Sequence, residues 1–173
     1  MVGFDDPWPN GAHYLTQDYL AAYALRTGQR LYGDTIWARS LNFFDFAVMQ
    51  NFHPPTNAVF FAPFSYLSFG HALVIWNLLS LIAYIGLIVL LLRLYGLATF
   101  WGVHLSALLL LWKPFAATIG HGQSSVVITF FLVAGLAFLK SDSQRLAGGA
   151  LAIATLIKLF PGFLLLYLIV KRK

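Results

Sequence analysis

The chain has 173 residues, of which 60% are hydrophobic and 10% are charged, and it contains no cysteine. Soluble domains carry about 25% charged residues, so this composition indicates an integral membrane protein. The lack of thiols excludes disulfides, thiolate catalysis and cysteine-based metal sites. The net charge of +5 comes from basic residues that are scattered singly and mostly flank apolar runs, a distribution that argues against nucleic-acid binding.

The N-terminal region, residues 1–69, is polar and aromatic, and we expect it to form an extracytoplasmic loop segment of short helices. Within it, residues 16–25 predict a helix that Thr16 caps and Gly28 ends. Residues 35–51 have the apolar spacing of a second surface helix.

A stiff His-Pro-Pro sequence follows. Pro54 and Pro55 fix the backbone and would hold His53 at the rim of a cavity. The competing interpretation is a simple loop that leads into a helix. Residues 57–69 are apolar but short, and Pro63 breaks them, so they predict an interfacial helix rather than a membrane crossing.

The remaining residues, 70–173, predict one incomplete membrane domain of transmembrane helices, since about 20 apolar residues cross a bilayer core. The predicted crossings are residues 70–92, 97–112 and 124–139. Arg93 and Lys140 follow the first and third crossings, so the positive-inside rule places both in the cytoplasm. The N-terminal region and the loop 114–123 then share the opposite, extracytoplasmic face.

The last apolar stretch, residues 146–170, has basic residues at both ends and Pro161-Gly162 near its middle. Prolines and glycines interrupt membrane helices where the backbone lines a cavity. A re-entrant hairpin with its vertex near Pro161 accounts for both features. One kinked span that violates the charge rule is the alternative.

Asp18 is the acid that we select as a catalytic candidate. A carboxylate in an aromatic segment beside a membrane can act as a general base toward a hydroxyl group. Alternatively, Asp18 is an acid in the first turn of a helix, where the helix dipole stabilises it. The other early acids are rivals for the same role, namely Asp5, Asp6, Asp34 and Asp45.

Two further polar features stand out. His121 and Gln123 lie in a Gly-His-Gly-Gln loop and offer hydrogen bonds suited to sugar hydroxyls. The competing interpretation is a tight turn whose polar residues are incidental. Lys158 lies within an apolar stretch, where a lysine costs about 2.5–3.5 kcal/mol and usually marks a functional path. It would meet an anion such as a lipid phosphate, or it snorkels along a helix. The five histidines show no metal-binding spacing.

Five segments, in this order, resemble the integral-membrane glycosyltransferases of family 87 in the GT-C superfamily, which includes polyprenyl-phosphate-mannose-dependent α-mannosyltransferases. The segments are QDYLAAYALRTGQRLYG (17–33), HPPTNAVFFAPFSYL (53–67), IWNL (75–78), GHGQSS (120–125) and AGGALAIATLIKLFPGFLLLY (147–167). At a position where many members carry an earlier Asp this chain has Tyr14, so the nearby acids stay alternatives to Asp18. We expect the chain to be the N-terminal part of a larger enzyme.

The resemblance implies a polytopic, all-α, GT-C-like fold and transfer of a hexose, mannose in the first instance, to a glycan or glycolipid acceptor. The donor it implies is a polyprenyl-phosphate sugar, used as a substrate, with no cofactor. Asp18 would deprotonate the acceptor hydroxyl, which attacks the anomeric carbon with inversion. Lys158 and Arg26 would stabilise the phosphate charge, and the sugars would be positioned by His53, His121 and Gln123.

The implied location is a bacterial plasma membrane, with the active site extracytoplasmic and the lipid bilayer as the surroundings. The alternative is a non-enzymatic polytopic protein, either a transporter half or an assembly subunit. A transporter should place its charges along a path reached from both faces. In this sequence the polar residues gather on one predicted face, which favours the enzyme.

Overall fold

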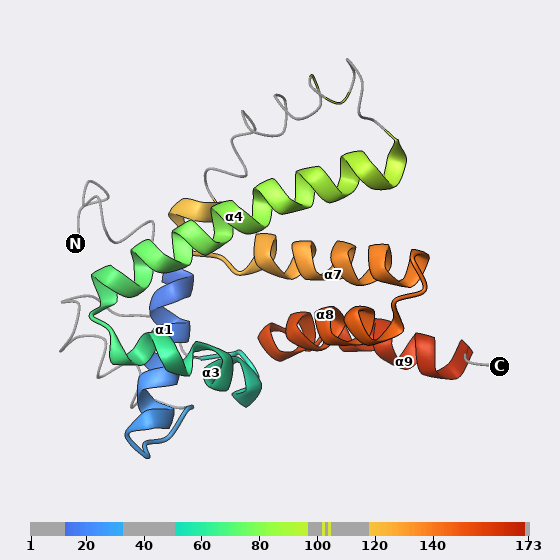
Figure 1. Ribbon diagram of the computed structural model, residues 1–173. Coiled ribbons are helices and arrows are strands. Elements are labelled where there is room, and N and C mark those ends of the chain that lie inside the picture. The colour runs from blue at the N-terminus through green and yellow to red at the C-terminus, as the bar shows by residue number, and fades with distance from the viewer. Residues whose placement is uncertain (1–12, 33–50, 97–101, 103, 105–117, 172–173) are drawn as a thin grey trace. The chain divides into compact units, whose positions relative to one another are not determined.

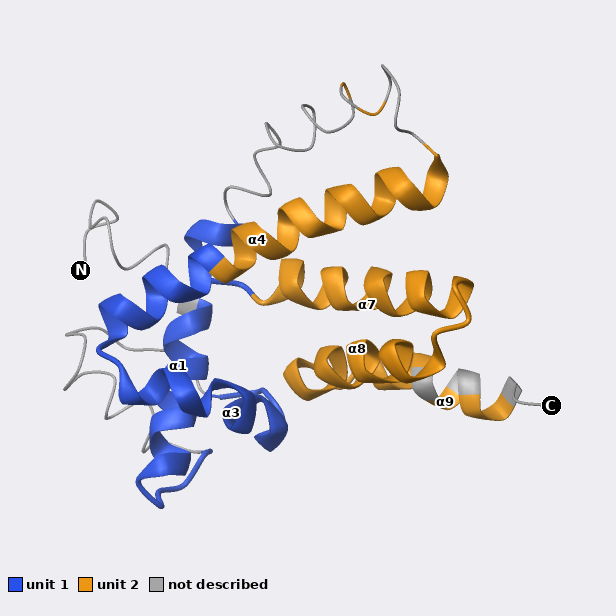
Figure 2. Cartoon of the chain, viewed as in Figure 1, with its two compact units in different colours: residues 1–78, 117–123 blue, residues 79–116, 124–173 orange. Residues whose placement is uncertain are grey.

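The computed structural model describes residues 13–32, 51–96, 102, 104 and 118–171, which form helices joined by turns, with no strand among them (Figure 1). The chain divides into two compact units (Figure 2). Unit 1 comprises residues 1–78 and 117–123, and unit 2 comprises residues 79–116 and 124–173. For the part of the chain described, the predicted all-helical class is confirmed.

Unit 1 is built around helix α1 (His13–Arg26), which packs against helix α3 (Pro55–Phe61) and the 3-10 helix η1 (Ala62–Tyr66). The predicted start of α1 is wrong. Thr16 lies inside the helix and is fully buried, so it does not act as an N-cap. The helix extends further toward the N-terminus because tertiary burial of its first turns outweighs the local capping preference of threonine.

The predicted end of α1 is confirmed at Gly28, whose φ of +67° is the left-handed conformation that glycine adopts most easily. Two hydrogen bonds close the last turn. The Gln29 N–H donates to the Ala24 carbonyl at 2.8 Å, and the Gly28 N–H donates to the Leu25 carbonyl at 3.3 Å. This pair of bonds is a Schellman motif, which satisfies carbonyls that the helix end leaves free.

The His-Pro-Pro sequence initiates helix α3. Pro54 is extended, with φ −64° and ψ 158°, and Pro55 is the first helical residue, where its missing N–H costs nothing. After Phe61 the backbone changes to the 3-10 form over η1, whose second residue is Pro63. The helix that was expected to be short and broken is therefore observed as two short pieces, and its interfacial position stays a prediction.

A cluster of aromatic rings packs these pieces against the first turns of helix α4. Phe61 and Trp76 are fully or almost fully buried, with ring centroids 4.7 Å apart. Phe64 meets the Trp76 ring edge-on at 5.8 Å, and Phe60 does so at 6.3 Å. Such pairs contribute about 0.5–1.5 kcal/mol each beyond their burial, so the cluster fixes unit 1 around Trp76.

Helix α4 (Phe69–Tyr95) has 27 residues and matches the first predicted crossing. Within the described residues it is the helix that is long and apolar enough, by length and composition, to cross a bilayer. Helices α7 (Ser125–Lys140) and α8 (Gln144–Ile157) are apolar but shorter. The number of crossings therefore stays a prediction.

In unit 2, helices α7 and α8 form a closely packed antiparallel pair (Figure 1). Small residues line their contact, and a Cβ at Gly135 would lie 2.8 Å from Leu151. Close approach through small residues is how helices associate in membranes. Lys140, at the end of α7, donates a hydrogen bond to the Leu94 carbonyl at 3.4 Å. The basic ends of α4 and α7 thus lie at one end of unit 2.

The last apolar stretch is two helices, α8 and α9 (Gly162–Lys171), separated at residues 158–161. Lys158 ends α8 in an extended conformation, with φ −141° and ψ 142°. The break includes Pro161, near which the vertex was predicted, and α9 packs against α8. Whether the pair re-enters the membrane stays a prediction, as do the domain limits. The predicted helix 35–51, apart from residue 51, and nearly all of the predicted crossing 97–112 lie outside the described residues.

Replacing Gly135 by alanine tests the α7–α8 contact. We expect a loss of about 1–3 kcal/mol in stability, because the added methyl group has no room beside Leu151. The measurement is the thermal unfolding midpoint in detergent. Gly148→Ala, on α8, is the matched control, since a Cβ there meets nothing within 4 Å. Equal midpoints for the two variants would contradict the packing.

Candidate active site

The candidate site begins with Asp18, the sixth residue of α1. Asp18 lies beyond the first turn of α1, so the interpretation as an acid in the first turn of a helix is wrong. Its side chain is 2% exposed. Its neighbours Thr16 and Gln17 are buried as well. Since a buried charge is costly unless it is paired, a carboxylate in this place needs compensating partners.

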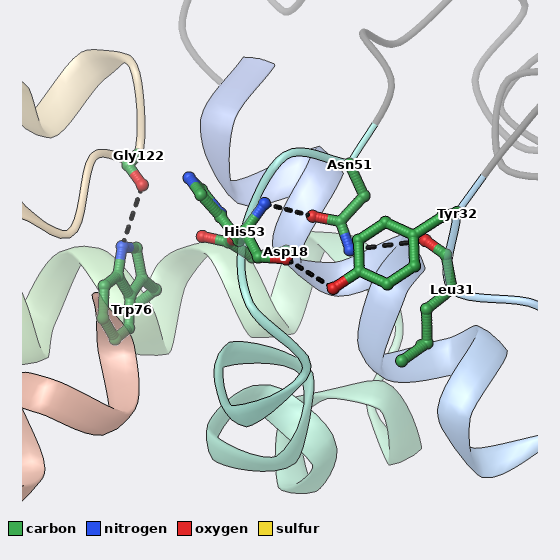
Figure 3. Close-up of polar contacts among 7 residues, drawn as sticks. All are labelled: Asp18, Leu31, Tyr32, Asn51, His53, Trp76 and Gly122. Carbon is green, nitrogen blue, oxygen red and sulfur yellow. Dashed lines mark hydrogen bonds and ion pairs between the residues drawn. The ribbon is translucent and has the colours of Figure 1, made fainter. Parts of the chain in front are cut away.

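Asp18 is paired with His53. The His53 Nδ1 and the Asp18 Oδ1 lie 2.5 Å apart, and the His53 side chain is 17% exposed. Figure 3 shows the imidazole and the carboxylate facing each other. The two residues are 35 positions apart in sequence, so the contact depends on α3 packing against α1. The structure thus brings together two of the residues that the sequence singled out.

The backbone of His53 is held on both sides. Its N–H donates to the Asn51 Oδ1 at 2.9 Å, and its carbonyl accepts from the Tyr32 hydroxyl at 2.9 Å (Figure 3). The Asn51 amide in turn donates to the Leu31 carbonyl at 3.4 Å. Together with the rigid Pro54, these bonds fix the position from which the imidazole extends toward Asp18.

The Gly-His-Gly-Gln loop packs on the same unit. Trp76 donates its Nε1–H to the Gly122 carbonyl at 3.1 Å (Figure 3). Gly122 has a φ of +63°, and a Cβ there would lie 2.7 Å from the Leu15 Cβ. Leu15 precedes Asp18 by three residues, so the two lie on one side of α1. The loop is therefore anchored one helical turn from the carboxylate.

His121 and Gln123 flank this anchor point. The His121 carbonyl accepts from the Tyr14 N–H at 3.4 Å, and the Gln123 N–H donates to the Thr118 carbonyl at 3.0 Å. Both side chains are half-buried. Their predicted contacts with sugars stay predictions.

Arg26 lies at the opposite end of α1, eight residues beyond Asp18, or about 12 Å along the axis at 1.5 Å per residue. Its guanidinium stacks on the rings of Tyr23 and Tyr66, at 4.9 and 4.8 Å from their centroids. Cation–π contacts hold such a group in place while it stays exposed. The Cα atoms of Arg26 and Asp18 are therefore far apart along the helix axis.

Tyr19 joins α1 to the segment after η1, since its hydroxyl donates to the Leu67 carbonyl at 2.8 Å. Burial raises the pKa of Tyr19, an effect that the charge of Arg26 opposes. The phenol therefore stays protonated and keeps this donor role. Its ring also meets Phe69 edge-on at 5.5 Å.

Lys158 belongs to unit 2, at the break between α8 and α9, where it is half-buried. Its part in binding a phosphate stays a prediction. The rival acids Asp5, Asp6, Asp34 and Asp45 lie outside the described residues. Among the residues that the structure describes, no group of three His, Asp, Glu or Cys side chains is arranged to hold a metal ion.

Three residues of this site were not selected from the sequence, namely Tyr32, Asn51 and Trp76. Asn51 had a readable signal, because an Asn two residues before a fixed backbone position often bonds to that position in an Asx turn. The other two act over 21 and 46 residues of separation, which no local pattern reveals.

Residues 51–173 match Glycosyltransferase family 87. The chain belongs to this family. No curated protein and no solved structure matches the chain. Membership in family 87 makes the protein a glycosyltransferase and favours the enzyme over a transporter half or an assembly subunit.

The family 87 match includes His53, His121, Gln123 and Lys158, whereas Asp18 precedes it. The contact with His53 nevertheless ties Asp18 to the matched part of the chain. The resemblance first recognised from sequence segments is therefore confirmed, while the roles of the individual residues stay predictions.

The anchoring of the loop can be tested with two alanine variants. Gly122→Ala should lower stability clearly more than Gly28→Ala. Both glycines have a φ above +60°, so both variants carry the same backbone strain, but only the Cβ at Gly122 meets another atom, in Leu15. We expect an added cost of about 1–3 kcal/mol, read from thermal midpoints. A difference near zero would show that the loop is not seated on α1.

Proposed function

We propose that this glycosyltransferase moves a hexose, mannose in the first instance, from a polyprenyl phosphate to a hydroxyl of a glycan or glycolipid at the extracytoplasmic face of a bacterial plasma membrane. The observation that carries the catalytic part is the buried Asp18 paired with His53. Deprotonating a hydroxyl needs such a base, and a carboxylate–imidazole pair supplies one.

The reaction has one bond-forming and one bond-breaking step at the anomeric carbon. The acceptor oxygen attacks that carbon, the bond from carbon to phosphate oxygen breaks, and polyprenyl phosphate leaves with the electron pair. The acceptor proton goes to the Asp18–His53 pair. Attack from the face opposite the leaving group inverts the anomeric centre.

Cationic groups are needed for the leaving phosphate, and Lys158 and Arg26 are the candidates. Lys158 lies in the break between two apolar helices, α8 and α9. Arg26 is exposed, and its guanidinium is held by two aromatic rings. A fixed positive charge near a leaving phosphate stabilises the charge that develops there. His121 and Gln123, on the loop anchored beside α1, are the candidates for hydrogen bonds to the sugars.

A lipid-linked donor is favoured by the apolar character of the chain. Helix α4 is apolar over a length that crosses a bilayer, and α7 and α8 are apolar too. A donor that partitions into the bilayer reaches such an enzyme from the membrane. The sequence also carries no nucleotide-binding motif that would suggest a sugar nucleotide.

The donor class is tested with the full-length product of the natural gene in membranes. Polyprenyl-phosphate mannose, polyprenyl-phosphate glucose and GDP-mannose are supplied separately in radiolabelled form, with a lipid extract as acceptor. We expect transfer from a polyprenyl-phosphate sugar and none from GDP-mannose in membranes that cannot make the lipid donor. Transfer from GDP-mannose in those membranes would contradict the proposed donor.

The Asp18 carboxylate is tested by Asp18→Asn, which keeps the size of the side chain and removes its charge. We expect transfer to fall by about 10²–10⁴-fold, the usual contribution of general base catalysis. Asp142→Asn is the matched control, since Asp142 is exposed and its left-handed φ of 59° suits asparagine. Retained activity in Asp18→Asn would remove the carboxylate from the mechanism.

A further inference from the structure

Either side chain of the Asp18–His53 pair could take the acceptor proton, but the two differ in how deeply they are buried. The Asp18 side chain is 2% exposed, whereas that of His53 is 17% exposed. A general base must reach the proton that it removes, either directly or through one water. Access therefore favours the imidazole as the group that meets the acceptor.

We infer that the Nε2 of His53 accepts the acceptor proton, and that Asp18 is a positioning residue that acts through the Nδ1 of His53. This inference rests on the proposed function. It gives His53 a catalytic role instead of the sugar-positioning role suggested by the sequence. It also explains why the carboxylate can be so deeply buried.

In the proposed resting state Asp18 is ionised, and its contact with His53 then sets which nitrogen is free to act. An ionised carboxylate only accepts hydrogen bonds, so the Nδ1 of His53 carries the hydrogen that bridges the 2.5 Å to Asp18. In a neutral imidazole the other nitrogen then has a free lone pair. Within the part of the chain that the structure describes, the Nε2 of His53 makes no hydrogen bond. It is therefore available to a hydroxyl group.

The burial of Asp18 stabilises the product of proton transfer. Once the Nε2 of His53 holds the proton, the ring is an imidazolium that faces a carboxylate shielded from water. Charges attract more strongly in such surroundings than in bulk water. The same division of labour between an orienting acid and a histidine base operates in serine hydrolases.

The histidine is also mounted rigidly enough for this role. Asn51 and Tyr32 hold its backbone at 2.9 Å on either side, and Pro54 follows it. A base held in this way is already oriented before the substrate binds, and such preorganisation makes proton transfer efficient. Among the described residues, the titratable groups hydrogen-bonded to His53 are Asp18, at the ring, and Tyr32, at the backbone carbonyl.

The test compares His53→Gln and His53→Ala with wild type, using the full-length protein in membranes and the donor that wild type accepts. Both variants should lose about 10²–10⁴-fold in kcat with little change in KM for the donor. Added imidazole should restore part of the activity of His53→Ala, a rescue that a merely structural role would not produce. The matched control is His71→Ala, an exposed histidine on α4, which should stay active and unaffected by imidazole.

The pH dependence gives a second readout. Wild-type kcat/KM should fall toward acidic pH, where a base that is already protonated cannot take the acceptor proton, and this fall should vanish from the residual activity of His53→Gln. The inference is overturned if His53→Gln keeps more than a third of the activity while Asp18→Asn loses it. It is also overturned if a folded His53→Ala shows no response to imidazole. Lack of transfer by wild type from any lipid donor would instead contradict the proposed function.

Discussion

The paired side chains of Asp18 and His53 impose the strongest constraint on unit 1. A carboxylate that is 2% exposed would be costly by itself, and removing one member of a buried pair typically costs 3–5 kcal/mol. The pair joins α1 to the start of α3, two segments that lie 35 residues apart. Hydrophobic burial supplies most of the packing around it, while the pair requires one particular alignment of the two helices.

Several local features converge on this alignment. Pro54 and Pro55 start α3 at a fixed residue, and the Asn51 side chain holds the turn before it. One helical turn from Asp18 along α1, Gly122 approaches Leu15 more closely than any residue with a Cβ could. The same arrangement that stabilises the unit therefore places a glycine-rich loop one helical turn from the buried carboxylate of Asp18.

Local and compositional features of the structure could be predicted, and tertiary ones could not. The long apolar run predicted helix α4, Gly28 predicted the end of α1, and Pro161-Gly162 predicted a break in the last apolar stretch, because each depends on composition or on one residue's backbone preference. Asp18 was selected from its chemistry alone. His53 was selected too, but its pairing with Asp18 could not be predicted, since the contact arises only when two distant helices pack together. The start of α1 was missed for the same reason.

The protonation of the His53 ring is the most direct readout of the proposed path of the acceptor proton. Nitrogen NMR of the protein labelled with ¹⁵N-histidine in lipid nanodiscs distinguishes the two neutral forms of the ring, and the spectrum of His53→Gln identifies the signal. We expect the hydrogen of the neutral ring to reside on Nδ1, and Asp18→Asn to disturb this form. A hydrogen on Nε2, unchanged by the substitution of Asp18, would contradict the role proposed for His53.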